Sequence, residues 1–254
     1  MKRLLIVMLL VPALLPAATG NPNSLHKQFV VADSLILHGW FTPAPTKVSA
    51  PLYVLLPMRG HAHDSYDSFI SALSERYRAD SSGSAAGRPH ILTLDLRGHG
   101  LSISAASGEL DFGSMGKSEY AKIPDDIVTA VNQLLADSSR QIDRDNIVII
   151  GASIGANSSV MAAAELAGVT KVVMLSPGED YLSLQPAEAI KSFKGKILIC
   201  SSKDDTYSSE SSESLARLNP KQTLLYVYPG KEHGTNLIGN NPMALSELLD
   251  WLER

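Results

Sequence analysis

The sequence predicts an α/β protein built on one mostly parallel sheet with helices on both faces. Eight short aliphatic or β-branched segments recur along the chain, each bounded by turn residues. Amphipathic helical patterns separate most of them, which is the alternation that produces a parallel sheet. The later strand segments are almost purely apolar, as expected for strands buried on both faces.

The expected elements follow directly from these patterns. The expected strands cover residues 28–32, 35–41, 52–56, 91–94, 147–150, 172–175, 197–201 and 224–227. Asp33 and Ser34 separate the first two segments and predict a hairpin between them. Five helices are expected over residues 66–78, 123–136, 156–167, 210–218 and 243–252.

The amino terminus has the features of a secretory signal peptide. Two basic residues precede an apolar run over residues 4–18, which two prolines interrupt. A membrane-spanning helix needs roughly 18–20 apolar residues, so this run is too short to be one. Ala18 and Gly20 supply small residues at the −3 and −1 positions of a cleavage site. We expect a signal peptide over 1–20 and a single domain over 21–254, with an uncleaved anchor or a buried helix as the alternative.

Composition and charge exclude several classes of protein. The chain has 254 residues, 44% of them apolar, and a formal charge of −4, so it can form a large core and offers no basic stripe for nucleic acid. The single cysteine, Cys200, excludes an internal disulfide, a Cys-rich zinc site and an iron–sulfur cluster. Its place within an apolar segment predicts an inert core residue. Export with one cysteine suggests a bacterial periplasmic or secreted protein that is stabilised by its core instead of disulfides. We expect no stable membrane insertion after signal removal.

The segment 151–155 carries the clearest chemical signal, the sequence GASIG. It follows an apolar strand and precedes an Ala-rich helix, where a sharp turn, the nucleophile elbow, lifts a serine hydroxyl above the sheet. G-x-S-x-G alone is a weak motif, but this position between strand and helix is the one that the mechanism requires. We therefore expect Ser153 to be a nucleophile.

A serine nucleophile needs a base and an acid that orients the base. His233 follows the last expected strand, and Asp204 and Asp205 follow the strand before it, which is the chain order of this arrangement. We favour Asp205 over Asp204 as the acid, although the spacing leaves both open. The oxyanion needs two backbone N–H donors: we expect one from Ile154 and the other from Arg59, with Met58 as its alternative.

With these residues, the chain resembles the α/β-hydrolase fold family over residues 28–254. Besides the elbow, the segment 95–102, DLRGHGLS, resembles the D-x-R-G-x-G-x-S turn typical of that family, where it is chiefly structural. The segment 176–178, SPG, is similar to small bacterial esterase-like members. The resemblance implies the same nucleophile, acid and base, here Ser153, Asp205 and His233. Many members have His-Gly where this chain has Pro57 and Met58, which leaves the second oxyanion donor open.

Two further patterns bear on ligands. His61 and His63 resemble part of an H-x-H-x-D-H metal motif, but Ser65 and Tyr66 replace its last two ligands, so we expect a loop at the site mouth and no metal. The segment 113–118 resembles the end of a phosphate-binding loop. Asp111 occupies the required first glycine position and no strand is expected before it, so nucleotide binding is rejected.

The favoured function is that of an exported serine hydrolase without a cofactor, acting on a small-molecule substrate. Residues 179–194 leave room for one short helix but no lid domain, and residues 101–120 are similarly short. We therefore expect little or no cap, an open shallow site, and a carboxylesterase that cleaves small or exposed acyl esters. The alternatives are a thioesterase or peptidase with the same triad, and a non-catalytic binding protein of this fold. The sequence leaves the oligomeric state open.

Overall fold

The computed structural model describes residues 24–46, 48–79, 88–137 and 141–254. The expected signal peptide, residues 1–20, lies outside the described residues. The strands are β1 (Leu25–Val30), β2 (Ile36–Thr42), β3 (Ala50–Leu56), β4 (His90–Leu94), β5 (Ser104–Ala105), β6 (Gly108–Glu109), β7 (Ile142–Ala152), β8 (Val169–Leu175), β9 (Lys196–Ser202) and β10 (Thr223–Tyr228). The helices are α1 (Asp67–Ala79), α2 (Lys117–Tyr120), α3 (Ile123–Ala136), α4 (Ile154–Glu165), α5 (Ala187–Ser192), α6 (Thr206–Ala216), α7 (Thr235–Asn240) and α8 (Pro242–Glu253). Among the described residues, no helix is both long and apolar enough to span a membrane.

Eight strands form one sheet in the order β1-β2-β4-β3-β7-β8-β9-β10. The β1–β2 hairpin and the β2–β4 pair are antiparallel, and every other neighbouring pair in this sheet is parallel. The predicted eight-stranded, mostly parallel sheet is therefore confirmed. Because the carboxyl ends of parallel strands lie on the same side of the sheet, the segments after β3, β7, β8, β9 and β10 gather at this carboxyl end.

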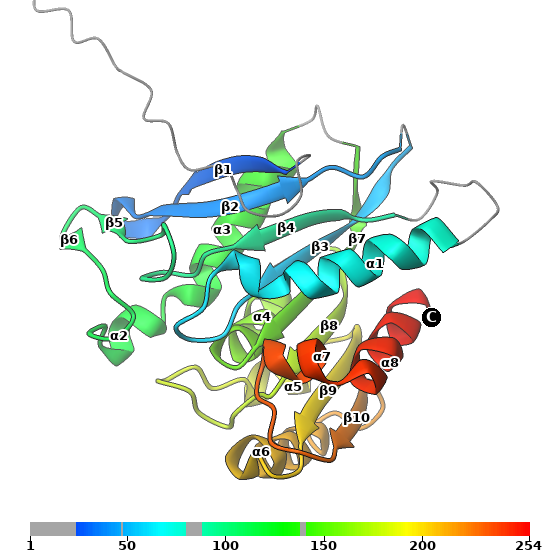
Figure 1. Ribbon diagram of the computed structural model, residues 1–254. Coiled ribbons are helices and arrows are strands. Elements are labelled where there is room, and N and C mark those ends of the chain that lie inside the picture. Colours follow the sequence, from blue (N-terminus) through cyan, green and yellow to red (C-terminus); the bar gives the residue numbers. More distant parts are fainter. Residues whose placement is uncertain (1–23, 47, 80–87, 138–140) are drawn as a thin grey trace, which may run out of the picture.

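Two apolar cores lie on opposite faces of this sheet, because successive side chains of a strand point to opposite sides. In β3, Leu52 and Val54 contribute to one core, and Tyr53 and Leu55 contribute to the other. Helices α3, α4, α5 and α6 pack on the first face, and α1, α7 and α8 pack on the second (Figure 1). This arrangement confirms the predicted helices on both faces.

Several expected boundaries are wrong, for identifiable reasons. Strand β1 ends at Val30 instead of residue 32, because a short 3₁₀ helix, Ala32–Ser34, forms the hairpin turn. Strand β7 begins five residues early, because Ile142 pairs with Ala50 before a register shift. Helix α6 begins four residues early, because its inner face is formed by buried serines that carry no apolar signal.

Other differences concern the edge of the sheet and the short elements. Strand β10 is partly exposed, with Leu224 and Val227 38% and 39% accessible, because it lies at the sheet edge. The small ribbon β5–β6 and the helices α2 and α7 have too few residues to show a periodic pattern. Strand β6 ends two residues before Asp111, so the expectation that no strand precedes the phosphate-loop-like segment was wrong.

Candidate active site

The predicted nucleophile Ser153 sits in a sharp turn between β7 and α4. Its backbone has φ 54° and ψ −115°, a left-handed conformation that is unusual for a residue with a side chain. The Ser153 amide donates a hydrogen bond of 2.8 Å to the Leu175 carbonyl of neighbouring β8. Strain of this kind persists only where the surrounding structure enforces it, and it clusters at functional positions.

The two glycines of the motif are required by backbone contacts. A Cβ at Gly151 would lie 2.0 Å from the Gly155 carbonyl oxygen. A Cβ at Gly155 would lie 2.5 Å from the Leu56 carbonyl oxygen and 2.6 Å from that of Pro57. The first turn of α4 therefore packs directly against the loop that follows β3, and only glycine permits this approach.

The predicted acid and base lie on adjacent loops and are joined by a hydrogen bond. His233 Nδ1 lies 2.6 Å from Asp205 Oδ2, and the two side chains are 36% and 19% exposed. Asp204 is exposed, and its amide donates to the Gly230 carbonyl. The structure thus pairs His233 with Asp205, and leaves the other ring nitrogen, Nε2, available for a different partner. Within the described residues, no hydrogen bond joins Ser153 to His233.

Two buried hydroxyls hold the histidine loop. Ser176, which follows β8 with φ 52°, accepts a hydrogen bond of 2.9 Å at Oγ from the Gly234 amide. Ser202, at the end of β9, donates from Oγ to the Glu232 carbonyl at 2.7 Å. The backbone on both sides of His233 is therefore tied to the carboxyl ends of β8 and β9.

The candidate oxyanion donors lie on either side of the Gly155 contact. In the part of the chain that the structure describes, the amides of Ile154, Met58 and Arg59 donate to no backbone acceptor. The Met58 side chain is 6% exposed, and its Sδ would be 2.6 Å from a Cβ placed on Gly234. This contact brings the loop after β3 against the histidine loop as well as against the elbow.

The Arg59 side chain has defined partners, so it is not simply solvated. Its Nε donates to Tyr120 Oη at 2.8 Å, and its Nη2 donates to the Phe112 carbonyl at 3.1 Å. The guanidinium carbon also lies 5.4 Å from the centre of the Phe112 ring. These contacts tie the loop after β3 to the segment that ends in α2.

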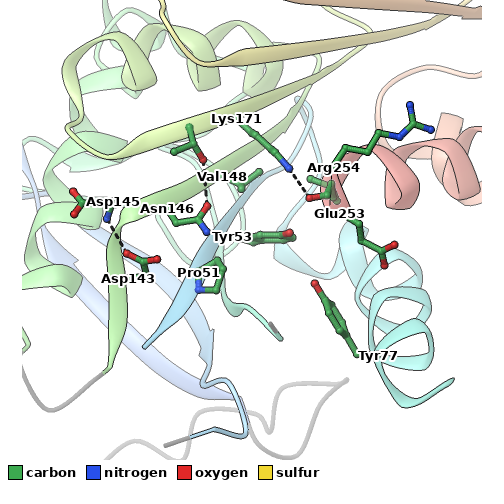
Figure 2. A pocket seen from close by; sticks show the side chains of 12 residues that line it. Pro51, Tyr53, Tyr77, Asp143, Asp145, Asn146, Val148, Lys171, Glu253 and Arg254 are labelled. Atoms are coloured by element: carbon green, nitrogen blue, oxygen red, sulfur yellow. Dashed lines mark hydrogen bonds between the residues drawn. The ribbon is translucent and has the colours of Figure 1, made fainter. Parts of the chain in front are cut away.

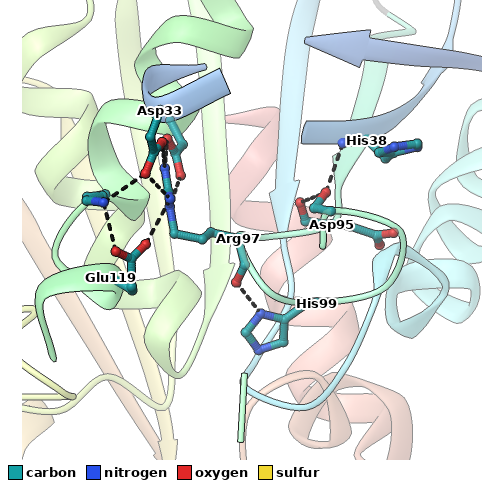
Figure 3. Close-up of polar contacts among 9 residues, drawn as sticks. Asp33, His38, Asp95, Arg97, His99 and Glu119 are labelled. Carbon is teal, nitrogen blue, oxygen red and sulfur yellow. Dashed lines mark hydrogen bonds and ion pairs between the residues drawn. The ribbon is translucent and has the colours of Figure 1, made fainter. Parts of the chain in front are cut away.

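The D-x-R-G-x-G-x-S segment forms a closed turn beside β4 (Figure 3). Its Asp95 carboxylate accepts from the amides of His63 and Leu101, both at 2.8 Å. Ser102 Oγ donates to the Asp95 carbonyl at 2.7 Å and accepts from the His38 amide at 2.8 Å. These local bonds engage the Asp95 carboxylate and the Ser102 hydroxyl within the fold.

A fully buried arginine anchors the same turn. Arg97 donates two hydrogen bonds of 2.8 Å to Asp126, and it also pairs with Asp33 and Glu119 (Figure 3). Burial raises the pKa of Asp126 to about 6, against the lowering effect of Arg97. A buried guanidinium needs such partners, because an unpaired buried charge is costly.

The histidine and cysteine that suggested other chemistry have different environments. His63 Nδ1 lies 2.9 Å from Asp95 Oδ1, and its ring stacks on Trp40. Among the described residues, no group of three or more His, Cys, Asp or Glu side chains could hold a metal ion. Cys200 is fully buried in β9, and burial raises its thiol pKa to about 12, which keeps it protonated.

Tyr181, in the loop after β8, is the site residue that sequence reasoning missed. Its ring meets the His233 ring edge to face, with centroids 6.3 Å apart. Burial raises the pKa of its phenol to about 12, against the lowering effect of the Ser208 and Ser153 hydroxyls. No spacing rule identifies this tyrosine, because its position depends on the path of an irregular loop.

A separate cavity of about 670 Å³ lies at the opposite end of the strands (Figure 2). It is lined by the first residues of β3, β7 and β8 together with the carboxyl terminus, among them Pro51, Asp143 and Lys171. Lys171 Nζ donates to the Leu252 carbonyl at 2.6 Å, so this cation is already engaged. Ser153 follows the other end of β7, so this cavity is not part of the candidate site.

The chain belongs to the alpha/beta hydrolase family, whose model matches residues 35–229. This result agrees with the fold described above and confirms the resemblance noted in the sequence. A search of curated protein sequences finds no significant match.

Solved structures share the fold at low sequence identity. The esterase Pf2001 of Pyrococcus furiosus aligns with a TM-score of 0.67 at 16% identity, covering 91% of this chain and 90% of that one. An acylaminoacyl peptidase of Pyrococcus horikoshii aligns with a TM-score of 0.68 at 17% identity, covering 91% of this chain but 41% of that one. A dipeptidyl peptidase 4 of Porphyromonas gingivalis aligns with a TM-score of 0.61 at 14% identity, over 90% and 35% of the two chains.

Proposed function

We propose that this protein is a serine hydrolase, and specifically a carboxylesterase that cleaves small or exposed acyl esters. The observation that carries the proposal is the 2.6 Å hydrogen bond between His233 and Asp205, on loops tied to the same sheet edge as Ser153. The strained backbone of Ser153 supports it, because that conformation is costly and needs a functional reason.

In this mechanism, Ser153 Oγ attacks the ester carbonyl carbon while its proton moves to His233 Nε2. Asp205 holds the histidine by Nδ1 and stabilises the imidazolium that forms. The amide of Ile154, with that of Arg59 or Met58, donates hydrogen bonds to the developing oxyanion. His233 then protonates the departing alcohol. In the second half of the reaction, His233 takes a proton from a water molecule that attacks the acyl carbon, and it then returns this proton to Ser153 Oγ as the carboxylic acid leaves.

The preference for small or exposed esters rests on the absence of a cap. Between β8 and β9 the described chain forms only an irregular loop and the six-residue helix α5. The segment before α3 contains the β5–β6 ribbon and α2, which are also short. A site without a lid has little apolar surface to bury a long acyl chain.

A thioesterase or peptidase with the same residues is the nearest alternative, and a non-catalytic binding protein is the alternative from another class. The paired acid and base favour an enzyme, since a binding protein gains nothing from keeping them. We further propose that residues 1–20 direct export to a bacterial periplasm or exterior. Amino-terminal sequencing of the protein recovered after expression in an exporting host tests this second proposal, because export with cleavage removes residues 1–20.

The decisive experiment is labelling of the purified protein with a fluorophosphonate probe. We expect the wild-type chain and Ser192→Ala, an exposed control at the end of α5, to label equally, and Ser153→Ala to remain unlabelled. Labelling that does not depend on Ser153 refutes the serine hydrolase proposal. A chain-length series of p-nitrophenyl esters then tests the acyl preference, and a marked preference for long chains contradicts the open site.

A further inference from the structure

The Arg59 side chain is fixed along one edge of its planar guanidinium group. Its Nε donates to Tyr120 Oη at 2.8 Å, and its Nη2 donates to the Phe112 carbonyl oxygen at 3.1 Å. Tyr120 Oη in turn donates to the same carbonyl oxygen at 2.5 Å, so the three hydrogen bonds close a ring. Because Nε and Nη2 lie on the same edge of the group, these bonds engage that edge alone.

The partners of Arg59 are themselves held in place. Tyr120 is 1% exposed and belongs to the apolar core on the face covered by α3 and α4. The Phe112 ring stacks on the buried His99 ring with centroids 5.0 Å apart, and a Cβ on Gly60 would lie 3.3 Å from an atom of the Phe112 ring. The Arg59 guanidinium carbon lies 5.4 and 6.0 Å from the centres of the Phe112 and Tyr120 rings. The guanidinium is therefore positioned before any ligand binds.

The opposite edge of the guanidinium has no protein acceptor. An arginine side chain carries several N–H donors, and the bonds described above use one on Nε and one on Nη2. In the part of the chain that the structure describes, the N–H groups that remain on Nη1 and Nη2 meet no acceptor, and no carboxylate forms an ion pair with Arg59. Arg76 and Arg97, by contrast, both pair with Asp or Glu side chains. Arg59 is exposed, so it presents a fixed positive charge without a counter-ion.

This charge lies beside the candidate site, on the side away from the histidine. Arg59 directly follows Met58, whose side chain packs against the histidine loop. The contacts of the Arg59 side chain lie in the segment after β4, whereas His233 follows β10. In the sheet, β4 and β10 lie on opposite sides of β7, the strand that leads to Ser153. The guanidinium and the imidazole therefore flank Ser153 from opposite sides.

We propose that Arg59 binds a carboxylate at the far end of the substrate's acyl group, so that this protein cleaves dicarboxylic acid esters in which one carboxyl group is free. The inference rests on the proposed role of Ser153 as the nucleophile. The departing alcohol must face His233, which protonates it, so the acyl group extends toward the side where Arg59 lies. Parallel N–H groups on the open edge of a guanidinium match the two oxygens of a carboxylate.

The free carboxylate takes no part in bond making or breaking. Ser153 Oγ replaces the alkoxy group at the acyl carbon, the alcohol leaves with the proton from His233, and water then releases the dicarboxylic acid. Because Arg59 is already held by its own hydrogen bonds, little side-chain entropy is lost when the carboxylate binds. The chain has a formal net charge of −4, so its overall field disfavours an anionic substrate. A preference for such a substrate must therefore come from a local cation.

The test compares monomethyl esters of the straight-chain dicarboxylic acids from succinate to pimelate with methyl esters of acids of the same shape, in which an isopropyl group replaces the free carboxylate. Hydrolysis is followed by base uptake at constant pH. We expect kcat/KM of the wild-type protein to be at least about fivefold higher for the best anionic ester than for its neutral counterpart, as for an ion pair with a fixed arginine. This ratio should fall as sodium chloride is added, because salt screens exposed charges.

Arg59→Met should lower this anionic-to-neutral ratio to about one or less, because no cation remains to pair with the carboxylate. The Arg59 amide is a candidate oxyanion donor, so the ratio within each variant is the measurement: a displaced backbone slows both esters together. Lys203→Met is the matched control, because Lys203 is an exposed cation in the loop after β9. It loses the same charge, and we expect it to keep the wild-type ratio.

Three results overturn the inference and leave the esterase proposal standing. They are a wild-type ratio of about one or less, a ratio in Arg59→Met equal to that of the wild type, and a ratio that falls as far in Lys203→Met as in Arg59→Met, which shows a general charge effect only. Absence of Ser153-dependent cleavage of every ester in both series overturns the proposed function itself.

Discussion

Substitution of Gly155 by alanine tests whether the elbow and the loop after β3 form one rigid unit. The added Cβ would lie 2.5 Å from the Leu56 carbonyl oxygen and 2.6 Å from that of Pro57, whereas real Cβ atoms essentially never come within 3.0 Å of such neighbours. Both obstacles are backbone atoms, so no side-chain rotation relieves the clash. The loop after β3 and the start of α4 must therefore separate by about half an ångström.

The consequence should be larger for activity than for stability. Overpacking of this size typically costs about 1–3 kcal/mol, and each kcal/mol lowers Tm by roughly 2–4 °C for a domain of this size. The same displacement moves the amide of Arg59 or Met58 relative to Ser153. Because misplacement by about 1 Å can cost 100-fold, we expect kcat/KM for p-nitrophenyl acetate to fall by about 10- to 100-fold.

Thermal unfolding and steady-state kinetics on the same preparations check both values. Gly239→Ala, in the short helix α7, is the control, because a Cβ there meets only Ser68 Oγ at 3.9 Å. We expect this control to keep its activity and its Tm. Full activity and an unchanged Tm in Gly155→Ala would show that the close contact does not position the site, and would refute the argument.

Two other predictions follow from individual side chains. Asp205→Asn should lower kcat by about 10³- to 10⁴-fold, because it removes the carboxylate that orients His233. Asp204→Asn should change kcat by less than about threefold. If steady-state kinetics give the reverse order, Asp204 is the acid instead. Burial lowers the pKa values of His26 and His38, whose rings share a 2.8 Å hydrogen bond, below the ordinary value of 6.5. The unfolded chain therefore binds protons more readily, and the free energy of unfolding should fall as the pH drops through about 6.5. His38→Gln should reduce this slope in urea titrations between about pH 7 and pH 5, and an identical slope contradicts the assignment.

The central sheet and the elbow could be predicted because backbone constraints leave a strong sequence signal. Strand β7 needs apolar residues on both faces, and Gly151 and Gly155 are required by contacts shorter than any side chain allows. His233 and Asp205 could be placed because the chain order fixes which loops meet at the sheet edge. In each case the pattern reports a requirement of the main chain, and such requirements are local in sequence.

The boundaries that sequence patterns missed depend on contacts between distant segments. Helix α6, which packs beside β9 and β10, buries Ser208, Ser209, Ser211 and Ser212, so its inner face looks polar in the sequence. The short ribbon β5–β6 and helices α2 and α7 contain too few residues for any periodicity. Their conformations are set by partners elsewhere in the chain, as Arg59 bonds to Tyr120 of α2 across the site.

Tyr181 combines both kinds of dependence, and this explains why the fold could be predicted more completely than the site. Its loop takes left-handed conformations at Leu182 and Ser183, residues with no glycine-like signal, and Asn157 fixes the loop ends from another element. The contacts that fix the turn at Ser153 are dictated by the main chain of the sheet. Tyr181, whose ring packs edge to face against the His233 ring, is supplied by an irregular loop, so this part of the candidate site lies where the sequence pattern describes the structure least.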